Sequence, residues 1–116
     1  MSELHFRNHH TSRIYVAIAF PNDACSAYGS AWGTKGWWPI DPGGEAYVLN
    51  GQELACFYAE AVDGLIWSGS QGPVYLPQPR FESCWGIGNN SPETRVVAMR
   101  LVYILSRNLY VNLVAA

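Results

Sequence analysis

The sequence predicts an all-β protein: a single-domain antiparallel β-sandwich of about eight or nine short strands that spans residues 1–116. Seven prolines and eleven glycines divide the chain into short pieces. The pieces between them are rich in β-branched and aromatic residues, which strands prefer. Hydrophobic residues make up 49% of the chain and charged residues 14%, a balance that favours a buried core over disorder.

The first strand is expected over residues 4–7, where apolar and polar residues alternate, and the polar stretch 8–12 should turn the chain. Residues 14–20 are apolar on both faces of a strand, which predicts a central position in a sheet. A loop is expected from residue 22 to about residue 30. A tryptophan-rich strand should then cover residues 32–40.

Turn signals such as Asn50-Gly51 and Asp63-Gly64 separate the remaining strands. We expect these strands over residues 46–49, 54–62, 65–67, 73–76, 81–85, 95–105 and 109–114. Residues 73–76 have flanking prolines and suit a short edge strand. Residues 95–105 can also be read as a helix, but their β-branched residues favour a strand. No segment predicts a helix convincingly.

Charge and hydropathy limit the classes of partner. The net charge of −2 provides no dense basic field, so we expect no nucleic-acid partner. No apolar run reaches the ~20 residues that span a bilayer, because Arg100 interrupts the longest one. The first residues lack the pattern of a secretory signal. We therefore expect a soluble protein that works inside the cell, leaves by a signal-independent route, or has been trimmed.

The last part of the chain is basic. Residues 94–116 carry Arg95, Arg100 and Arg107 and no acidic residue. We expect these arginines to pair with acidic neighbours on other strands. The alternative is a surface for phosphate or anionic lipid.

Three cysteines leave at least one thiol free unless it pairs between chains. Cys56 lies in an apolar strand and should be a buried small hydrophobe. Cys25 and Cys84 occupy loop or strand-edge positions and form the disulfide candidate, which could stabilise the fold by ~2–4 kcal/mol. An intracellular location would argue against this bridge.

Several motifs carry a resemblance to a known family. They are Phe6-Arg7-Asn8 with Tyr15-Val16-Ala17-Ile18, the run Gly36-Trp37-Trp38-Pro39-Ile40-Asp41-Pro42-Gly43, Tyr58-Ala59-Glu60-Ala61 with Asp63-Gly64 and Trp67-Ser68-Gly69, and Phe81 with Cys84. In order and spacing, over residues 4–88, the chain resembles the bacterial domain of unknown function 1036 family. That resemblance implies a small domain with no assigned chemistry.

The chain also departs from that family. The family tends to place a cysteine just after the Pro-Gly turn, where Gly44 and Glu45 stand here. Some members are labelled as integral membrane proteins, which the hydropathy of this chain does not support. The opening residues resemble, more loosely, small bacterial β-sandwich proteins that act on insects or membranes.

The five tryptophans are the first candidates for ligand binding: Trp32, Trp37, Trp38, Trp67 and Trp85. Trp37 and Trp38 are adjacent, so in a strand they should face opposite sides. A tryptophan exposed beside polar groups suits sugar stacking, a protein interface or a membrane surface. The alternative is that most of them belong to the core.

Glu60 and Asp63 flank the predicted hairpin turn and are also candidate ligand-binding residues. Glu60 lies in an otherwise apolar strand, so its carboxylate needs a partner, and we expect an arginine. The alternative is a glycosidase-like acid/base pair, which the distance between the carboxylates would decide.

Other catalytic or metal-binding signals are weak. His5, His9 and His10 have no Cys or His at standard ligand spacing, so we expect solvated histidines and no metal. The sequence contains neither a Gly-x-Ser-x-Gly motif nor a phosphate-cradling glycine loop. We therefore predict a chain that is not an enzyme and needs no cofactor.

These observations favour a non-enzymatic recognition module that binds a glycan or a protein through exposed aromatics and loops. The alternative is a membrane-active toxin or effector, insecticidal by the looser resemblance, with strands such as residues 96–105 re-pairing in a homo-oligomer. Leakage from lipid vesicles would discriminate the two.

Overall fold

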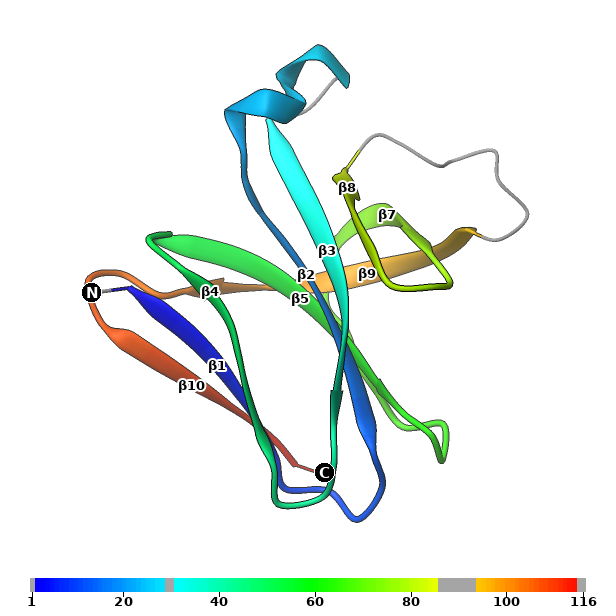
Figure 1. Cartoon of the computed structure of the whole chain (residues 1–116). Helices are drawn as coiled ribbons and strands as arrows, with labels where there is room; N and C mark the ends of the chain where they lie inside the picture. Colours follow the sequence, from blue (N-terminus) through cyan, green and yellow to red (C-terminus); the bar gives the residue numbers. More distant parts are fainter. Residues whose placement is uncertain (1, 29–30, 86–93, 115–116) are drawn as a thin grey trace.

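The computed structural model describes residues 2–28, 31–85 and 94–114, and β-strands dominate it (Figure 1). In these residues the elements are β1 (Glu3–Asn8), β2 (Ile14–Pro21), the 3₁₀-helix η1 (Asp23–Tyr28), β3 (Trp32–Ile40), β4 (Glu45–Asn50), β5 (Leu54–Ala61), β6 (Ile66–Trp67), β7 (Gln71–Pro77), β8 (Phe81–Cys84), β9 (Thr94–Tyr103) and β10 (Asn108–Leu113). The all-β prediction is confirmed. The described residues contain no helix of the length and apolar character that crossing a membrane requires.

The described residues form ten strands, more than the eight or nine of the predicted sandwich, and each overlaps one of the ten ranges expected from the sequence. The predicted loop after Asn22 contains η1. Asn22 starts this helix, because its side-chain oxygen accepts the Ala24 amide at 3.1 Å and its carbonyl accepts the Cys25 amide at 3.0 Å. Strand β9 ends two residues earlier than predicted. The strand ends there because the amides of Ile104 and Leu105 both donate to the carbonyl of Glu53.

The strands form two sheets. The smaller has the order β10-β1-β4, and the larger has the order β7-β9-β5-β2-β3-β8, with β6 paired to β5. One pair is parallel, β1 with β10, which corrects the prediction of an antiparallel fold. The reason is that β10 follows β9 by crossing to the other sheet, so it enters beside the start of β1 instead of folding back in a hairpin.

The first apolar cluster lies between the two sheets. Strand β1 points Leu4 and Phe6 into it, as the alternation predicts, and β2 contributes Val16 and Ile18 from the facing sheet. All four side chains are fully buried. This cluster holds the smaller sheet against the larger one.

The larger sheet curls into a half-barrel. Its two end strands, β7 and β8, are joined by residues 78–80 alone, so the ends of the sheet must approach each other. A second apolar cluster fills the inside of the curl, with Ala17 and Ala19 of β2 in contact with Val74 and Leu76 of β7 and with Met99 of β9. Strand β2 is therefore buried on both faces, as its sequence predicts.

A disulfide joins Cys25 of η1 to Cys84 of β8, the pair selected from the sequence, with the Cα atoms 5.5 Å apart. It fastens the last residue of β8 to the segment that precedes β3. Cys56 is free and buried, and burial raises the pKa of its thiol to about 11. The thiol is therefore protonated and poorly nucleophilic at neutral pH.

Candidate functional site

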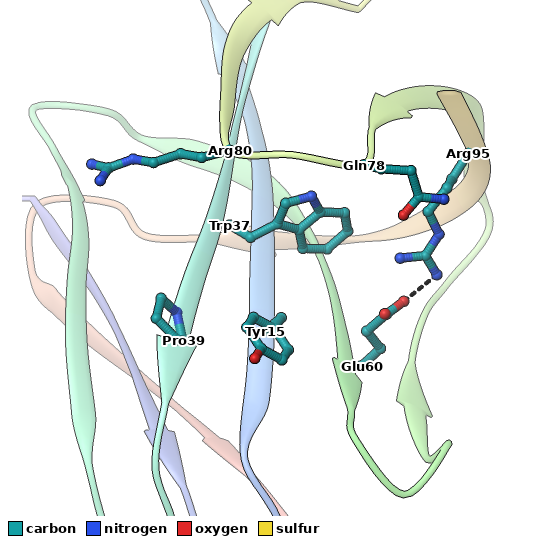
Figure 2. A pocket seen from close by; sticks show the side chains of 7 residues that line it. All are labelled: Tyr15, Trp37, Pro39, Glu60, Gln78, Arg80 and Arg95. Carbon is teal, nitrogen blue, oxygen red and sulfur yellow. Dashed lines mark hydrogen bonds and ion pairs between the residues drawn. The ribbon is translucent and has the colours of Figure 1, made fainter. Parts of the chain in front are cut away.

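A pocket of about 370 Å³ opens at one end of the half-barrel (Figure 2). Its lining residues are Tyr15, Trp37, Pro39, Glu60, Gln78, Arg80 and Arg95. Strand register explains three of them, because Tyr15 of β2 lies opposite Pro39 of β3 on one side and opposite Glu60 of β5 on the other. A volume of this size lies within the range of small-molecule sites.

Trp37 reaches the pocket from a β-bulge. Val16 pairs with Trp38 and Ala17 pairs with Gly36, so Trp37 is the extra residue of β3. The two neighbouring tryptophans then pack against different clusters, Trp38 against the one between the sheets and Trp37 against the one inside the curl. The prediction that they face opposite sides is confirmed.

The indole of Trp37 is fixed in place. Its Nε1 donates a hydrogen bond to the carbonyl of Pro77 at 3.1 Å, and its ring meets Tyr58 and Phe81 edge-on, with centroids 6.1 and 6.0 Å away. Gly36 makes this packing possible, because a Cβ at that position would lie 2.9 Å from the ring of Phe81. The pocket thus has a rigid, half-buried aromatic wall.

Glu60 and Arg95 form an ion pair on the far side of Trp37 from Arg80, as Figure 2 shows. Tyr58 also donates its hydroxyl to Glu60 at 3.0 Å. Partial burial opposes the charged form, but the hydrogen bonds from Arg95 and Tyr58 and the charge of Arg95 outweigh it and hold the pKa of Glu60 below its usual value. Glu60 is therefore an anion at neutral pH, with the arginine partner that the sequence predicts.

Arg95 also faces the aromatic wall. Its guanidinium carbon lies 5.5 Å from the centroid of Trp37 and 5.9 Å from that of Tyr58. These distances suit cation–π attraction, which orients the guanidinium beside the pocket. The pocket therefore combines an aromatic surface with a carboxylate, a guanidinium and the amide of Gln78, a set that can bind a polar ring on several sides.

The other tryptophans lie elsewhere. Trp32 and Trp85 form an edge-to-face pair at 5.9 Å and line a second cavity of about 280 Å³ at the opposite end of the half-barrel. Trp38 is half-buried against the cluster between the sheets. Trp67 is only 7% exposed, and its Nε1 donates to the carbonyl of Val114. Trp67 therefore belongs to the cluster between the sheets, although it also borders a further cavity of about 260 Å³, and its part in ligand binding stays a prediction.

Asp63 does not join Glu60. Its carboxylate lies 2.7 Å from His10 Nε2 and also accepts the amide of Leu65. The hydrogen bond from His10 lowers the pKa of Asp63. The carboxylates of Glu60 and Asp63 therefore have different partners, Arg95 and His10.

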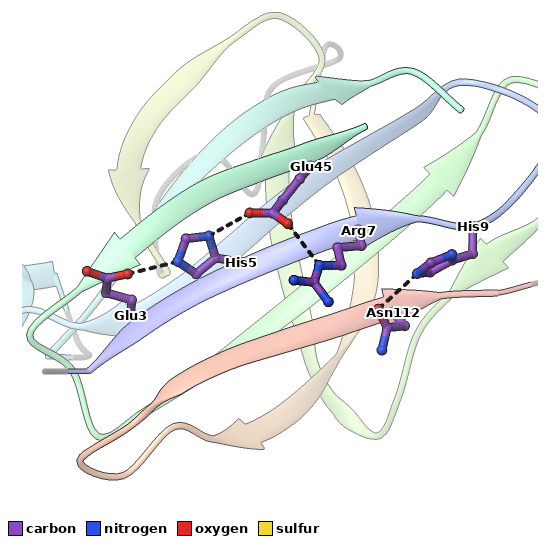
Figure 3. A network of polar contacts seen from close by, with 6 residues as sticks. All are labelled: Glu3, His5, Arg7, His9, Glu45 and Asn112. Atoms are coloured by element: carbon purple, nitrogen blue, oxygen red, sulfur yellow. Dashed lines mark hydrogen bonds and ion pairs between the residues drawn. The ribbon is translucent and has the colours of Figure 1, made fainter. Parts of the chain in front are cut away.

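His5 corrects the expectation of solvated histidines, whereas His9 is exposed as expected (Figure 3). His5 is 8% exposed rather than solvated, and its ring stacks between Tyr47 and Tyr110 at 4.8 and 4.6 Å. Its nitrogens lie 2.9 Å from Glu3 and 3.3 Å from Glu45. The cause is register: β1 is the middle strand of its sheet, and Tyr47 of β4 and Tyr110 of β10 lie directly opposite His5 on either side.

Among the described residues, Arg95 is the arginine of the basic segment that follows the predicted ion-pair pattern. Arg100 donates to the carbonyl of Ser68, and Arg107 donates to the carbonyls of Tyr103 and Ile104. The described contacts of these two arginines are thus with backbone carbonyls near the ends of strands.

Sequence reasoning missed most of the pocket. It selected Trp37 and Glu60 and passed over Tyr15, Pro39, Gln78, Arg80 and Arg95 as ligand-binding residues. Two signals were present: an unpaired carboxylate predicts an arginine nearby, and the polar segment 78–80 links two strands. Neither signal tells which strands become neighbours.

No family model, curated protein or solved structure matches the chain. The resemblance to the bacterial domain of unknown function 1036 family therefore stays a prediction. Within the described residues, no group of three or more His, Cys, Asp and Glu side chains is arranged to hold a metal ion.

Proposed function

We propose that this chain is a non-enzymatic recognition module that binds a glycan in the pocket around Trp37. The observation that carries the proposal is the fixed indole of Trp37 beside the Glu60–Arg95 pair. Sugar rings present apolar C–H faces that pack on an indole and hydroxyls that bridge carboxylate, guanidinium and amide groups. The two-sheet scaffold, which we interpret as a β-sandwich with one curled layer, supplies the rigidity.

Binding is favoured over catalysis by the state of the acidic group. Glycoside hydrolysis by the common mechanisms needs two carboxyl groups, one of them a proton donor. Among the described residues that line the pocket, Glu60 supplies the only carboxylate, and its pKa is lowered by Arg95 and Tyr58 against the effect of burial. An anion held in this way accepts hydrogen bonds from a ligand but is a poor general acid at neutral pH.

The test is a titration of the intrinsic tryptophan fluorescence with a panel of soluble oligosaccharides, repeated by calorimetry. We expect a saturable change with one sugar type that is lost in Trp37→Ala. Trp32→Ala is the matched control, because Trp32 is also half-buried against the inner cluster but lies at the other end of it. Melting curves report whether each variant is folded.

If Trp37→Ala unfolds, Gln78→Ala provides the same test. Gln78 is exposed, so its removal should leave stability unchanged and weaken sugar binding roughly two- to tenfold, the effect of one hydrogen bond. Sugar binding that survives in a folded Trp37→Ala would contradict this pocket. A fluorescence change with lipid vesicles alone, together with leakage, would favour the membrane-active alternative. No change with either sugars or vesicles would favour a protein partner.

A further inference from the structure

Next to the Trp37 pocket lies a second, smaller cavity of about 80 Å³. Its lining includes Trp37, Pro39 and Arg80, which also line the first pocket, together with Lys35 and Trp38. The shared residues make the two cavities neighbours along one edge of β3. A ligand seated on Trp37 can therefore extend into the smaller cavity.

The smaller cavity brings two cations together, Lys35 and Arg80. Among the residues that the structure describes, neither cation lies within 4 Å of a carboxylate. Glu82 stands opposite Lys35 in the strand register and still forms no ion pair with it. By contrast, Arg95 in the main pocket is paired with Glu60, so that pair is neutral overall.

The two charged groups lie on different sides of the indole. In Figure 2 the side chain of Arg80 extends away from the Glu60–Arg95 pair, with Trp37 between them. On the Arg80 side, Lys35 has its ammonium 5.9 Å from the ring of Trp38. One end of the combined site thus holds a closed ion pair, and the other end holds two cations without a described carboxylate within 4 Å.

We infer that the ligand is an acidic glycan, with a sugar ring on Trp37 and a carboxylate or sulfate group between Lys35 and Arg80. This inference rests on the proposed glycan-binding function and adds the chemical class of the ligand. Hydrogen bonds between a cation and an anionic oxygen are stronger than neutral ones, so the acidic group should raise affinity and fix the direction of the sugar chain.

The experiment compares three probes by calorimetry: a galactose oligomer, the galacturonate oligomer of equal length and an O-sulfated galactose oligomer. We expect at least one acidic probe to bind about tenfold or more tightly than the neutral one, the effect of one charge-assisted hydrogen bond. Its affinity should fall between about 0.05 M and about 0.5 M NaCl, while that of the neutral probe should not.

The double variant Lys35→Gln/Arg80→Gln should bring acidic and neutral probes to within about threefold of each other, because the acidic group then has neither cation to bind. Arg100→Gln is the matched control, because it removes an exposed positive charge on β9 that lines neither cavity. Equal binding of acidic and neutral probes to the native protein would overturn the inference and leave the proposed function intact. So would an acidic preference that survives in the double variant. Failure of every probe to bind would overturn both.

Discussion

Removing the disulfide between Cys25 and Cys84 should cost the fold about 4 kcal/mol. The bridge joins residues 59 positions apart, and closing a loop of that length in the unfolded chain lowers its entropy by about 14 cal/mol/K, or about 4 kcal/mol at 25 °C. For 116 residues, a loss of that size lowers the melting temperature by roughly 15 °C. The double variant Cys25→Ser/Cys84→Ser removes the bridge and leaves Cys56 in place.

Urea unfolding followed by tryptophan fluorescence measures this loss. Reductant added to the native protein should reproduce the variant, and reductant added to the variant should change nothing. Denatured native protein without reductant should show one titratable thiol, that of Cys56. A loss below about 1 kcal/mol, or three titratable thiols, would refute the reasoning, since either result would mean that the bridge does not restrict the unfolded chain.

The disulfide also bears on the pocket. Strand β8 pairs with β3 over four residues only, from Gly33 with Cys84 to Gly36 with Phe81. Without the bridge the end of β8 relies on this short pairing and on the contacts of Trp85 with Trp32, so its amides should exchange with solvent faster than those of β2 and β5. Because Phe81 packs against Trp37, ligand affinity should weaken together with this strand.

Other outcomes follow from the buried groups. The pKa of Glu60 is lower in the folded protein, so the ionised carboxylate stabilises the fold fully above the usual carboxyl pKa. This stabilisation is lost as the pH falls through the lowered pKa. Urea titrations at stepped pH should therefore show that Glu60→Gln loses less stability than the native protein between about pH 5 and pH 3. The Cys56 thiol, with its pKa raised by burial from 9.0 to about 11, should alkylate about 100-fold more slowly at pH 7 in the folded protein than after denaturation. Gly36→Ala should cost about 1–3 kcal/mol in urea unfolding because its Cβ would press on the ring of Phe81, and the added change Phe81→Leu should recover part of that loss.

Local signals in the sequence predicted the strands well. Glycine, proline and asparagine mark most of the turns, and residues 14–20 have apolar side chains on both faces because the strand they form, β2, lies between two clusters. The parallel pair of β1 and β10 could not be predicted in this way. It depends on a crossing between sheets, and the pattern of a single strand carries no information about its neighbour.

Trp67 shows why residue type alone does not tell whether a tryptophan is exposed. The hairpin after Glu60 folds Trp67 back onto Ala59, and a small residue opposite a large one leaves room for the indole to turn into the core. Its Nε1 donates a hydrogen bond to the carbonyl of Val114, which lies more than forty positions later in the chain. Burial of this tryptophan depends on a distant partner, which is a property of the fold and not of its local sequence.

The pocket forms where β3 extends beyond its pairing with β8. Strand β8 begins at Phe81, opposite Gly36, so the residues of β3 after Gly36 have no described strand on that side. Residues 78–80 connect β7 to β8 at this point. Trp37 closes part of the gap beside β3 by donating a hydrogen bond to the carbonyl of Pro77. The pocket therefore lies where the two ends of the curled sheet are joined, and Trp37 both lines the pocket and holds that junction. It follows that substitutions in this pocket should lower stability and affinity together, unless they are confined to exposed side chains such as Gln78 and Arg80.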